Sequence, residues 1–139
     1  IKTNRGGKIT LHNPGQKIVY FVINLNNRKK DIRKFIDVIE KSIIEFLNSF
    51  KIEGKEDKKN IGIWVKEKKI AAIGLRVSRW IAYHGFSINI SNNLKEYLKI
   101  VPCGLNNTKI TSIYSEKKLI PKNCEKKIIN LLIKNINKL

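Results

Sequence analysis

Apolar and polar positions along the chain alternate in ways that predict both strands and helices. Residues 8–11 and 17–24 have the β-rich pattern of two strands, and the Asn-Pro-Gly core of residues 12–16 between them is a strong turn signal. Asp31 then stands where a helix N-cap is expected. Apolar side chains recur every three or four residues after it, which predicts a helix to about Phe50. The apolar positions of that helix are Ile32, Phe35, Ile36, Ile39, Ile43, Phe46, Leu47 and Phe50.

The second half of the chain predicts a hairpin, a further strand and a closing helix. Residues 53–60 are charged and contain a glycine, so we expect a surface loop there. The elements expected after it are strands at 61–65 and 69–77 joined by a turn at 66–68, a strand at 80–90, a short helix at 94–100, a short strand or turn at 111–113, and a helix at 124–139 with Asn123 as its N-cap. This order predicts an α+β fold in which a mixed or antiparallel sheet carries helices on one face.

Length and composition fit one domain. The 139 residues, of which 42% are hydrophobic, suffice for a single core, and we expect residues 1–139 to form one domain. The longest apolar runs are too short to cross a bilayer. The two cysteines lie in different contexts that suggest no disulfide framework, so we expect a reducing compartment. Because the chain has no methionine, not even at position 1, we also expect that an N-terminal part of the domain is missing.

The charge of the chain is strongly positive. Its 29 Lys and Arg residues against 11 Asp and Glu residues give a net charge of +18. Such a surplus attracts acidic partners and speeds their encounter. Nucleic acid and acidic carrier proteins are both candidates, and a solvated lysine surface with no dedicated partner explains the composition equally well.

A thiol and an amine are the candidate reactive groups. Cys103 lies in Pro-Cys-Gly, a turn sequence that tends to hold a sulfur on an exposed bend. Lys69 directly precedes the apolar run Ile-Ala-Ala-Ile-Gly, so it can begin a buried strand and point along a pocket wall. A lysine near a thiol can lower the thiol pKa and raise the thiolate fraction. A lone cysteine is also commonly an inert buried residue.

Two further groups of residues suggest a pocket. Arg5, Gly6 and Gly7 combine a cation with backbone that a ligand can approach closely, although an ordinary turn explains them too. His12 and His84 each precede a glycine-bearing bend. Neither the histidines nor the cysteines have the close pair spacing of a structural zinc site, so we expect no metal.

Four motifs follow one another along the chain at residues 5–16, 69–74, 83–86 and 102–104. The first, Arg-Gly-Gly-Lys-Ile-Thr-Leu-His-Asn-Pro-Gly-Gln, resembles the RGG-x-x-T-x-H-G-P-G-Q signature of lipoyl(octanoyl) transferases. Lys-Ile-Ala-Ala-Ile-Gly, Tyr-His-Gly-Phe and Pro-Cys-Gly then follow in that family's order and at its spacing. The chain departs from the signature at Asn13, where the family usually has glycine.

The resemblance implies the catalytic-domain fold shared with biotin- and lipoate-protein ligases, and an acyltransferase that needs no ATP or other cofactor. In this family the residue matching Cys103 carries the acyl group as a thioester, and the residue matching Lys69 lowers the thiol pKa and moves protons. The resemblance further implies that substrate is bound by Arg5, Gly6, Gly7, Lys8, Ile9, Thr10, Leu11, His12, Ala72, Ile73, Gly74, His84, Gly85, Phe86 and Ser87.

The partners implied by the resemblance are protein substrates. The enzyme would take octanoyl from octanoyl-acyl carrier protein and pass it to a lysine of a lipoyl domain, in 2-oxoacid dehydrogenase complexes or the glycine-cleavage H protein. We expect a monomer in a bacterial cytoplasm, or in an organelle matrix if a targeting segment is missing, with no nucleic-acid or membrane partner. Two alternatives stay open: a basic nucleic-acid-binding module, and a relative of the same fold that binds carrier protein without catalysis.

Overall fold

A six-stranded sheet forms the centre of the molecule in the computed structural model, which describes residues 10–100 and 109–139. The strands lie in the spatial order β1-β5-β4-β3-β2, and β6 pairs with β4 in parallel. Their bounds are β1 Gln16–Asn24, β2 Lys55–Glu56, β3 Ile63–Val65, β4 Lys68–Ser78, β5 Ile81–Asn89 and β6 Lys109–Ile110. The sheet is therefore mixed, with antiparallel pairing between all neighbours except β4 and β6.

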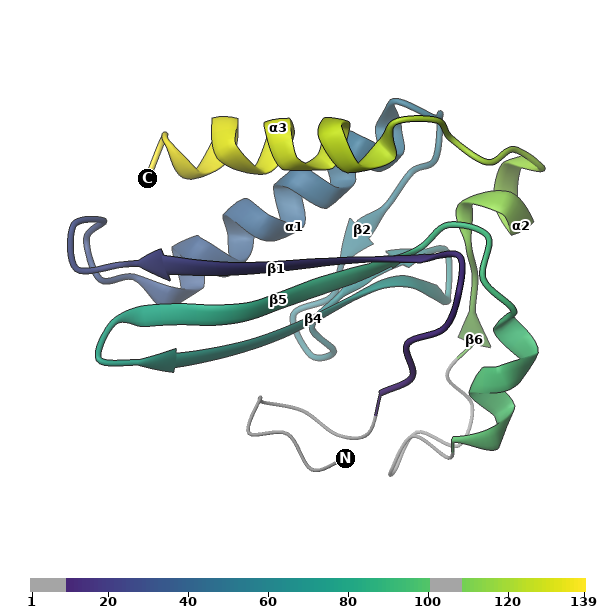
Figure 1. Ribbon diagram of the computed structural model, residues 1–139, viewed down its shortest axis with the longest axis horizontal. Coiled ribbons are helices and arrows are strands. Elements are labelled where there is room, and N and C mark those ends of the chain that lie inside the picture. Colours follow the sequence, from purple (N-terminus) through teal and green to yellow (C-terminus); the bar gives the residue numbers. More distant parts are fainter. Residues whose placement is uncertain (1–9, 101–108) are drawn as a thin grey trace.

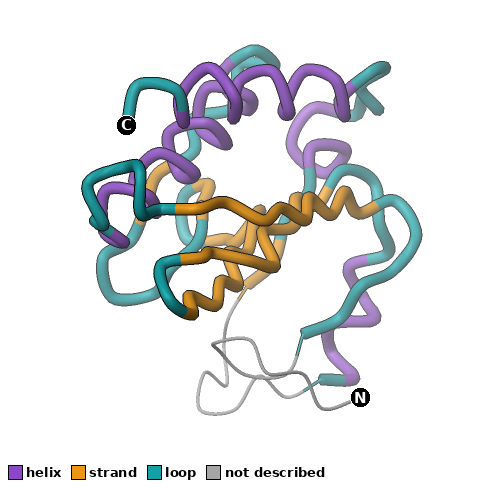
Figure 2. Tube along the Cα trace, turned by 60° about the vertical axis from the view of Figure 1, so that its left-hand side comes forward, coloured by secondary structure: helices purple, strands orange, loops and turns teal. Residues whose placement is uncertain are grey.

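Two long helices cover one face of this sheet. They are α1 (Ile32–Asn48) and α3 (Cys124–Ile136), which pack together above the strands in Figure 1 and on the same side again in Figure 2. The shorter η1 (Leu94–Lys99) and α2 (Ile113–Lys117) lie at one end of the sheet. No helix in residues 10–100 and 109–139 is long and apolar enough to cross a membrane.

The core lies between the sheet and the helices because α1 has one apolar stripe. Its fully buried side chains include Phe35, Ile39 and Ile43, and burial of each stabilises the fold by about 1.5–3 kcal/mol. The side chain of Asp31 caps the helix by accepting a hydrogen bond from the Lys34 backbone N–H at 3.0 Å. Phe35 also meets Phe21 of β1 edge-to-face, with ring centroids 5.6 Å apart.

No helix of the described residues covers the opposite face of the sheet, and strand alternation decides which residues reach it. In the pairing register, Ile18 of β1 lies beside Ser87 and Ala72, and Val22 lies beside Tyr83 and Arg76. Tyr20 and Val22 are 67% and 77% exposed. Phe86 and Ile88, which alternate with Gly85 and Ser87 along β5, are buried on the side of the helices. We call the uncovered side, with Ile18, Tyr20, Val22, Ala72 and Tyr83, the open face.

The sequence predictions for the main elements are confirmed, with differences at short ones. The predicted α1, the β3–β4 hairpin, β5 and α3 are present, and helices cover one face. The loop predicted at 53–60 was wrong at Lys55–Glu56, which form the edge strand β2. At 111–113 no strand forms, because Ser112 caps α2 by accepting from the Ser115 backbone N–H. Asn123 precedes α3 as predicted but makes no side-chain capping bond. Of the strand expected at 8–11, residues 8 and 9 lie outside the described residues and 10–11 form no strand.

Glu40 of α1 provides a test of the packing between the helix and β2. Burial, with the nearby carboxylates of Glu56 and Asp37, raises the pKa of Glu40 to about 7. Lys41, Ile44 and Glu45 line the same hollow. Between about pH 4.5 and pH 7 the folded chain keeps a proton that the unfolded chain has released, so this group makes stability fall as pH rises through that window.

We expect Glu40→Gln to raise the free energy of unfolding at pH 8 by about 1–3 kcal/mol relative to wild type, with a smaller gain at pH 5. Urea denaturation at the two pH values measures the difference. Glu53→Gln, at an exposed position after α1, is the matched control and should show no such dependence. An equal gain in the free energy of unfolding for Glu40→Gln at both pH values would contradict the raised pKa of Glu40.

Candidate active site

Lys69 reaches the open face because the β3–β4 pairing is irregular. Ile63 pairs with Ala71, but the next residue, Trp64, pairs with Lys69, so Ile70 is an extra residue in β4. Ile70 and Ala71 are both buried in the core, at 0% and 2% exposure. Without this bulge, alternation from Ala71 would turn Lys69 toward the helices. With it, Lys69 lies on the same side of the sheet as Trp64, away from the core.

The surroundings of Lys69 favour a neutral amine. Burial lowers its pKa below the ordinary value for lysine, and the carboxylate of Asp57 opposes this shift without cancelling it. The Nζ atom lies 5.3 Å from the centre of the Trp64 ring, which donates its indole N–H to the Asn60 carbonyl at 3.1 Å. The ring face attracts the ammonium form, whereas burial favours the neutral amine.

Gly62 makes room for the Lys69 side chain. A Cβ built on Gly62 would lie 2.4 Å from Lys69 Cε and 2.6 Å from the Ala71 carbonyl oxygen. The φ of Gly62 is +143°, a value that side-chain-bearing residues rarely adopt. The sequence prediction did not include Gly62, Trp64 or Asp57. The one signal in the sequence was a glycine inside the strand predicted at 61–65, two residues before a tryptophan.

The chain that follows Cys103 is held beside Lys69. β6 pairs in parallel with the start of β4, so that Ile110 lies opposite Lys69, and the Thr111 backbone N–H donates to the Lys69 carbonyl at 2.9 Å. Cys103 itself lies outside the described residues.

His84 also reaches the open face through an irregular backbone. Its φ is +71°, in the left-handed region, within the central strand β5. Consecutive strand residues normally point to opposite faces, yet the rings of Tyr83 and His84 are 4.9 Å apart. The left-handed backbone thus turns His84 to the side of Tyr83. Its Nε2 atom is buried without a hydrogen-bond partner among the described residues, which leaves a polar group for a ligand.

Glycine is required at position 85, beside His84. A Cβ there would lie 1.8 Å from the Val19 carbonyl oxygen of β1, an impossible approach. Gly85 pairs with Gly74 of β4 and with Tyr20 of β1, so two glycines lie side by side in the middle of the sheet. Of the pocket residues predicted from the sequence, Ala72, Gly74, Gly85 and Ser87 lie together in this region.

The structure separates two predicted pocket residues from the open face. Phe86 of β5 pairs with Ile73 of β4 on one side and with Val19 of β1 on the other, and all three pack into the core beneath the helices. Phe86 is only 3% exposed. Thr10 and Leu11 are half-buried and His12 is exposed in the segment before β1, which descends on the side of the sheet away from α1 and α3 in Figure 1. Arg5, Gly6, Gly7, Lys8 and Ile9 lie outside the described residues.

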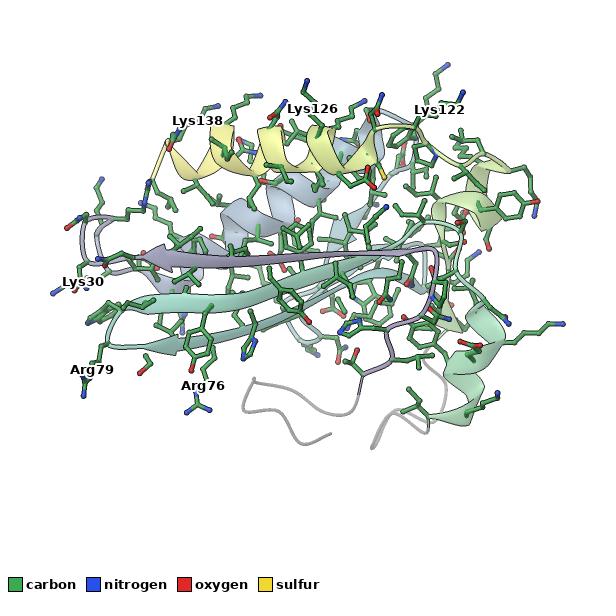
Figure 3. All side chains as sticks on the ribbon, viewed as in Figure 1. Lys30, Arg76, Arg79, Lys122, Lys126 and Lys138 are labelled. Atoms are coloured by element: carbon green, nitrogen blue, oxygen red, sulfur yellow. The ribbon has the colours of Figure 1, made fainter. Side chains whose placement is uncertain are left out.

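Basic side chains project from both sides of the molecule. In Figure 3, Arg76 and Arg79 point away from the sheet on the side without helices, while Lys122, Lys126 and Lys138 point outward from the α3 side.

Within residues 10–100 and 109–139 no group of three or more His, Cys, Asp or Glu side chains is placed to hold a metal ion.

Comparison with known proteins assigns the family. The model of the lipoyl protein ligase A/B catalytic domain matches residues 1–132. The chain belongs to this family. It is 46% identical over 124 residues to an octanoyltransferase of Bartonella tribocorum, covering 80% of this chain and 51% of the relative. It is 48% identical over 120 residues to an octanoyltransferase of Rickettsia rickettsii, covering 81% of this chain and 57% of the relative. The chain thus spans about half the length of the curated relatives it matches.

Solved structures confirm the predicted fold class. Lipoate-protein ligase A bound with ATP superposes with a TM-score of 0.74 at 12% identity, over 97% of this chain and 56% of that one. Biotin protein ligase from Aquifex aeolicus superposes with a TM-score of 0.70 at 17% identity, over 89% of this chain and 54% of that one. The likeness at such low identity establishes a shared fold of the biotin and lipoate protein ligase type.

The role of Gly62 can be tested through Lys69. We expect Gly62→Ala to displace the Lys69 side chain from its half-buried position, so that its pKa returns toward that of a solvated lysine. Titration of isotopically labelled lysine side chains by NMR, with Lys69→Arg for assignment, measures the change.

Gly54→Ala is the matched control for Gly62→Ala. A Cβ on Gly54 would meet the Ile63 Cγ2 atom at 2.8 Å and the Leu47 Cδ1 atom at 2.9 Å, which disturbs the core and not Lys69. If both alanine variants shifted the Lys69 titration equally, the shift would reflect a general loosening of the fold. Gly62 would then have no specific role in positioning Lys69.

Proposed function

We propose that this chain provides the catalytic centre of an octanoyltransferase, moving octanoyl from acyl carrier protein to a lysine of a lipoyl domain. The observation that carries the proposal is Lys69, a half-buried lysine with a lowered pKa that the bulge at Ile70 turns to the open face. The octanoyltransferases among its relatives support the same reaction. Because those relatives are bacterial, we place the activity in a bacterial cytoplasm.

In the first step, the Cys103 thiolate attacks the thioester carbonyl of the octanoyl carrier. The carbon–sulfur bond to Cys103 forms, the bond to the carrier sulfur breaks, and the carrier leaves as a thiolate that takes up a proton. Both sulfurs are thiolate leaving groups of similar quality, so the exchange is nearly balanced. A protonated Lys69 near Cys103 would favour the thiolate that begins this step.

In the second step, the amine of the incoming lysine attacks the Cys103 thioester. An amide bond forms, the Cys103–acyl bond breaks, and the amine loses a proton. A neutral Lys69 is suited to accept that proton, since its pKa lies below the ordinary value. The same residue thus serves in its charged form in the first step and in its neutral form in the second.

The open face offers a surface for the octanoyl chain. Gly74 and Gly85 lie side by side and present no side chains, and Ala72 beside Ser87 adds only a methyl group. Ile18 and Tyr20 of β1, which pair with Ser87 and Gly85, supply apolar area at the border. An apolar chain placed along these strands would be removed from water by side chains already on the sheet.

The positive charge supports recognition of protein substrates. Acyl carrier protein and lipoyl domains are acidic as classes, and the net charge of +18 would steer both toward this chain. We propose lipoyl domains of 2-oxoacid dehydrogenase complexes and the glycine-cleavage H protein as acceptors. A nucleic-acid-binding module would instead need basic residues clustered with exposed aromatics, and its binding would weaken steeply with salt.

The thioester step predicts one labelled cysteine. Incubation with octanoyl-acyl carrier protein should add one octanoyl group at Cys103, released by hydroxylamine and detected by intact-protein and peptide mass. Cys103→Ser should abolish the adduct. Cys124→Ser is the matched control, because Cys124 is 3% exposed and burial raises the pKa of its thiol, so its loss should leave the adduct intact.

An adduct at Cys124 alone would refute the proposed mechanism. No adduct on a folded protein that still binds carrier protein would favour the catalytically inactive carrier binder. Binding of a nucleic acid with a steep salt dependence, and no adduct, would favour the nucleic-acid module.

The proton transfer predicts a pH dependence that belongs to Lys69. Transfer from acylated enzyme to a lipoyl-domain lysine should rise with pH through the pKa of Lys69, since the neutral amine is the base. Lys69→Gln should lower the rate of this step by about 10²- to 10⁴-fold and remove that part of the profile. Single-turnover kinetics from pH 6 to 10 measure it.

The neighbouring Lys68→Gln is the control for Lys69→Gln. Lys68 makes an ion pair with Glu116 at 2.9 Å and so has a structural partner of its own. The variant should keep the wild-type profile. A profile unchanged in Lys69→Gln would remove Lys69 from the proton transfer.

A further inference from the structure

A chain of amide side chains connects His12 to the body of the sheet. His12 Nδ1 lies 2.7 Å from Gln16 Oε1. Gln16 Nε2 donates to Asn89 Oδ1 at 2.8 Å, and Asn89 Nδ2 donates to the Thr111 carbonyl at 3.1 Å. Asn89 is only 6% exposed, so this relay is anchored in the interior.

The anchor fixes the direction of every bond in the relay. The Thr111 carbonyl can only accept, so the end of Asn89 that faces it must be the NH₂ group. The Asn89 oxygen then faces Gln16, and the end of Gln16 that meets it must also be NH₂. The Gln16 oxygen is left to face His12, and an amide oxygen can only accept.

A second anchor, independent of Thr111, gives the same direction. Asn13 Nδ2 donates to the Asn93 carbonyl at 3.0 Å and to the Glu96 carboxylate at 2.7 Å. The Asn13 oxygen is thus turned toward Asn92, whose Nδ2 donates to it at 3.0 Å and to Asn89 Oδ1 at 3.1 Å. Asn89 again presents its oxygen to the network, as the Thr111 anchor requires.

We propose that Gln16 and Asn89 are positioning residues that hold neutral His12 in the Nδ1–H form, leaving the Nε2 lone pair for the substrate. In water a neutral histidine favours the opposite, Nε2–H form, so the relay reverses an ordinary preference. The inference rests on the proposed function and on the family resemblance, which implies that His12 belongs to the substrate-binding segment. Gln16 and Asn89 act through His12 and need not touch the substrate themselves.

The tautomer decides which substrate group His12 can serve. An Nε2 lone pair accepts a hydrogen bond, so it cannot stabilise the oxyanion that forms from a thioester carbonyl, which needs donors. It suits a group that carries hydrogens. In the proposed reaction that group is the amine of the incoming lysine, and the relay therefore assigns His12 to the acceptor lysine and not to the thioester oxygen.

The relay can be tested by NMR without any activity measurement. The chain has two histidines, and His12→Asn identifies the signals of His12. Nitrogen-15 shifts of the imidazole, at alkaline pH where the spectrum shows both rings neutral, separate protonated from lone-pair nitrogens. Wild type should show His12 with Nδ1 protonated, and Gln16→Leu should shift the population toward Nε2–H.

Tyr97→Phe is the matched control within the same network. The Tyr97 hydroxyl accepts from Gln16 Nε2 at 2.6 Å and donates to Asn89 Oδ1 at 3.2 Å. A hydroxyl can reverse its role, so it does not set the direction of the relay, and its loss should leave the His12 tautomer unchanged. In acyl transfer, Gln16→Leu should lower kcat at least about tenfold, and Tyr97→Phe should change it less than about twofold.

The outcomes separate the inference from the proposed function. His12 in the Nε2–H form in wild type, or an unchanged tautomer in Gln16→Leu, overturns the relay whatever the activity. Because wild type alone decides the first point, the test stands even if Gln16→Leu does not fold. The predicted tautomers with no acyl transfer by any variant would support the relay and refute the octanoyltransferase.

Discussion

Strand alternation is the constraint on which the rest of this structure depends. The helices α1 and α3 cover only one face of the sheet, so every second residue of β1, β5 and β4 is committed to the core. Lys69 and His84 fall at core positions by simple alternation from Ala71 and Phe86. Each reaches the open face only because the backbone departs from regular geometry at or beside it. The candidate site is thus built from two local exceptions to the rule that builds the fold.

The sequence predicted most of the architecture and little of this geometry. The helix over residues 32–48 follows from its apolar spacing and from Asp31, both of which act locally. The position of the Ile70 bulge depends on which residue of β3 pairs with Lys69, and no local pattern encodes that pairing. The left-handed backbone of His84 is likewise unusual for a residue inside a strand. Motif resemblance identified both residues, but their orientation needed the tertiary structure.

Asn13 shows how a departure from the family signature is accommodated. Where the family usually has glycine, its side chain makes hydrogen bonds to Asn92, to the Asn93 backbone and to Glu96 of η1. The segment before β1 is thereby tied to η1, a neighbouring element distant in sequence. Each such hydrogen bond contributes about 0.5–1.5 kcal/mol. Together they offset the conformational entropy that is lost when the loop is fixed. The network that orders this loop also contains the relay to His12.

The strained backbone at His84 has a consequence for how this sequence can change. A left-handed residue other than glycine costs about 1–2 kcal/mol, and here it lies in β5, which is paired on both sides along its length. The ladders to β1 and β4 hold the residue in a conformation that it would not adopt alone. Under the proposed function, selection for stability and selection for activity would pull position 84 in opposite directions, and the rigidity of β5 would decide how much strain the site can keep.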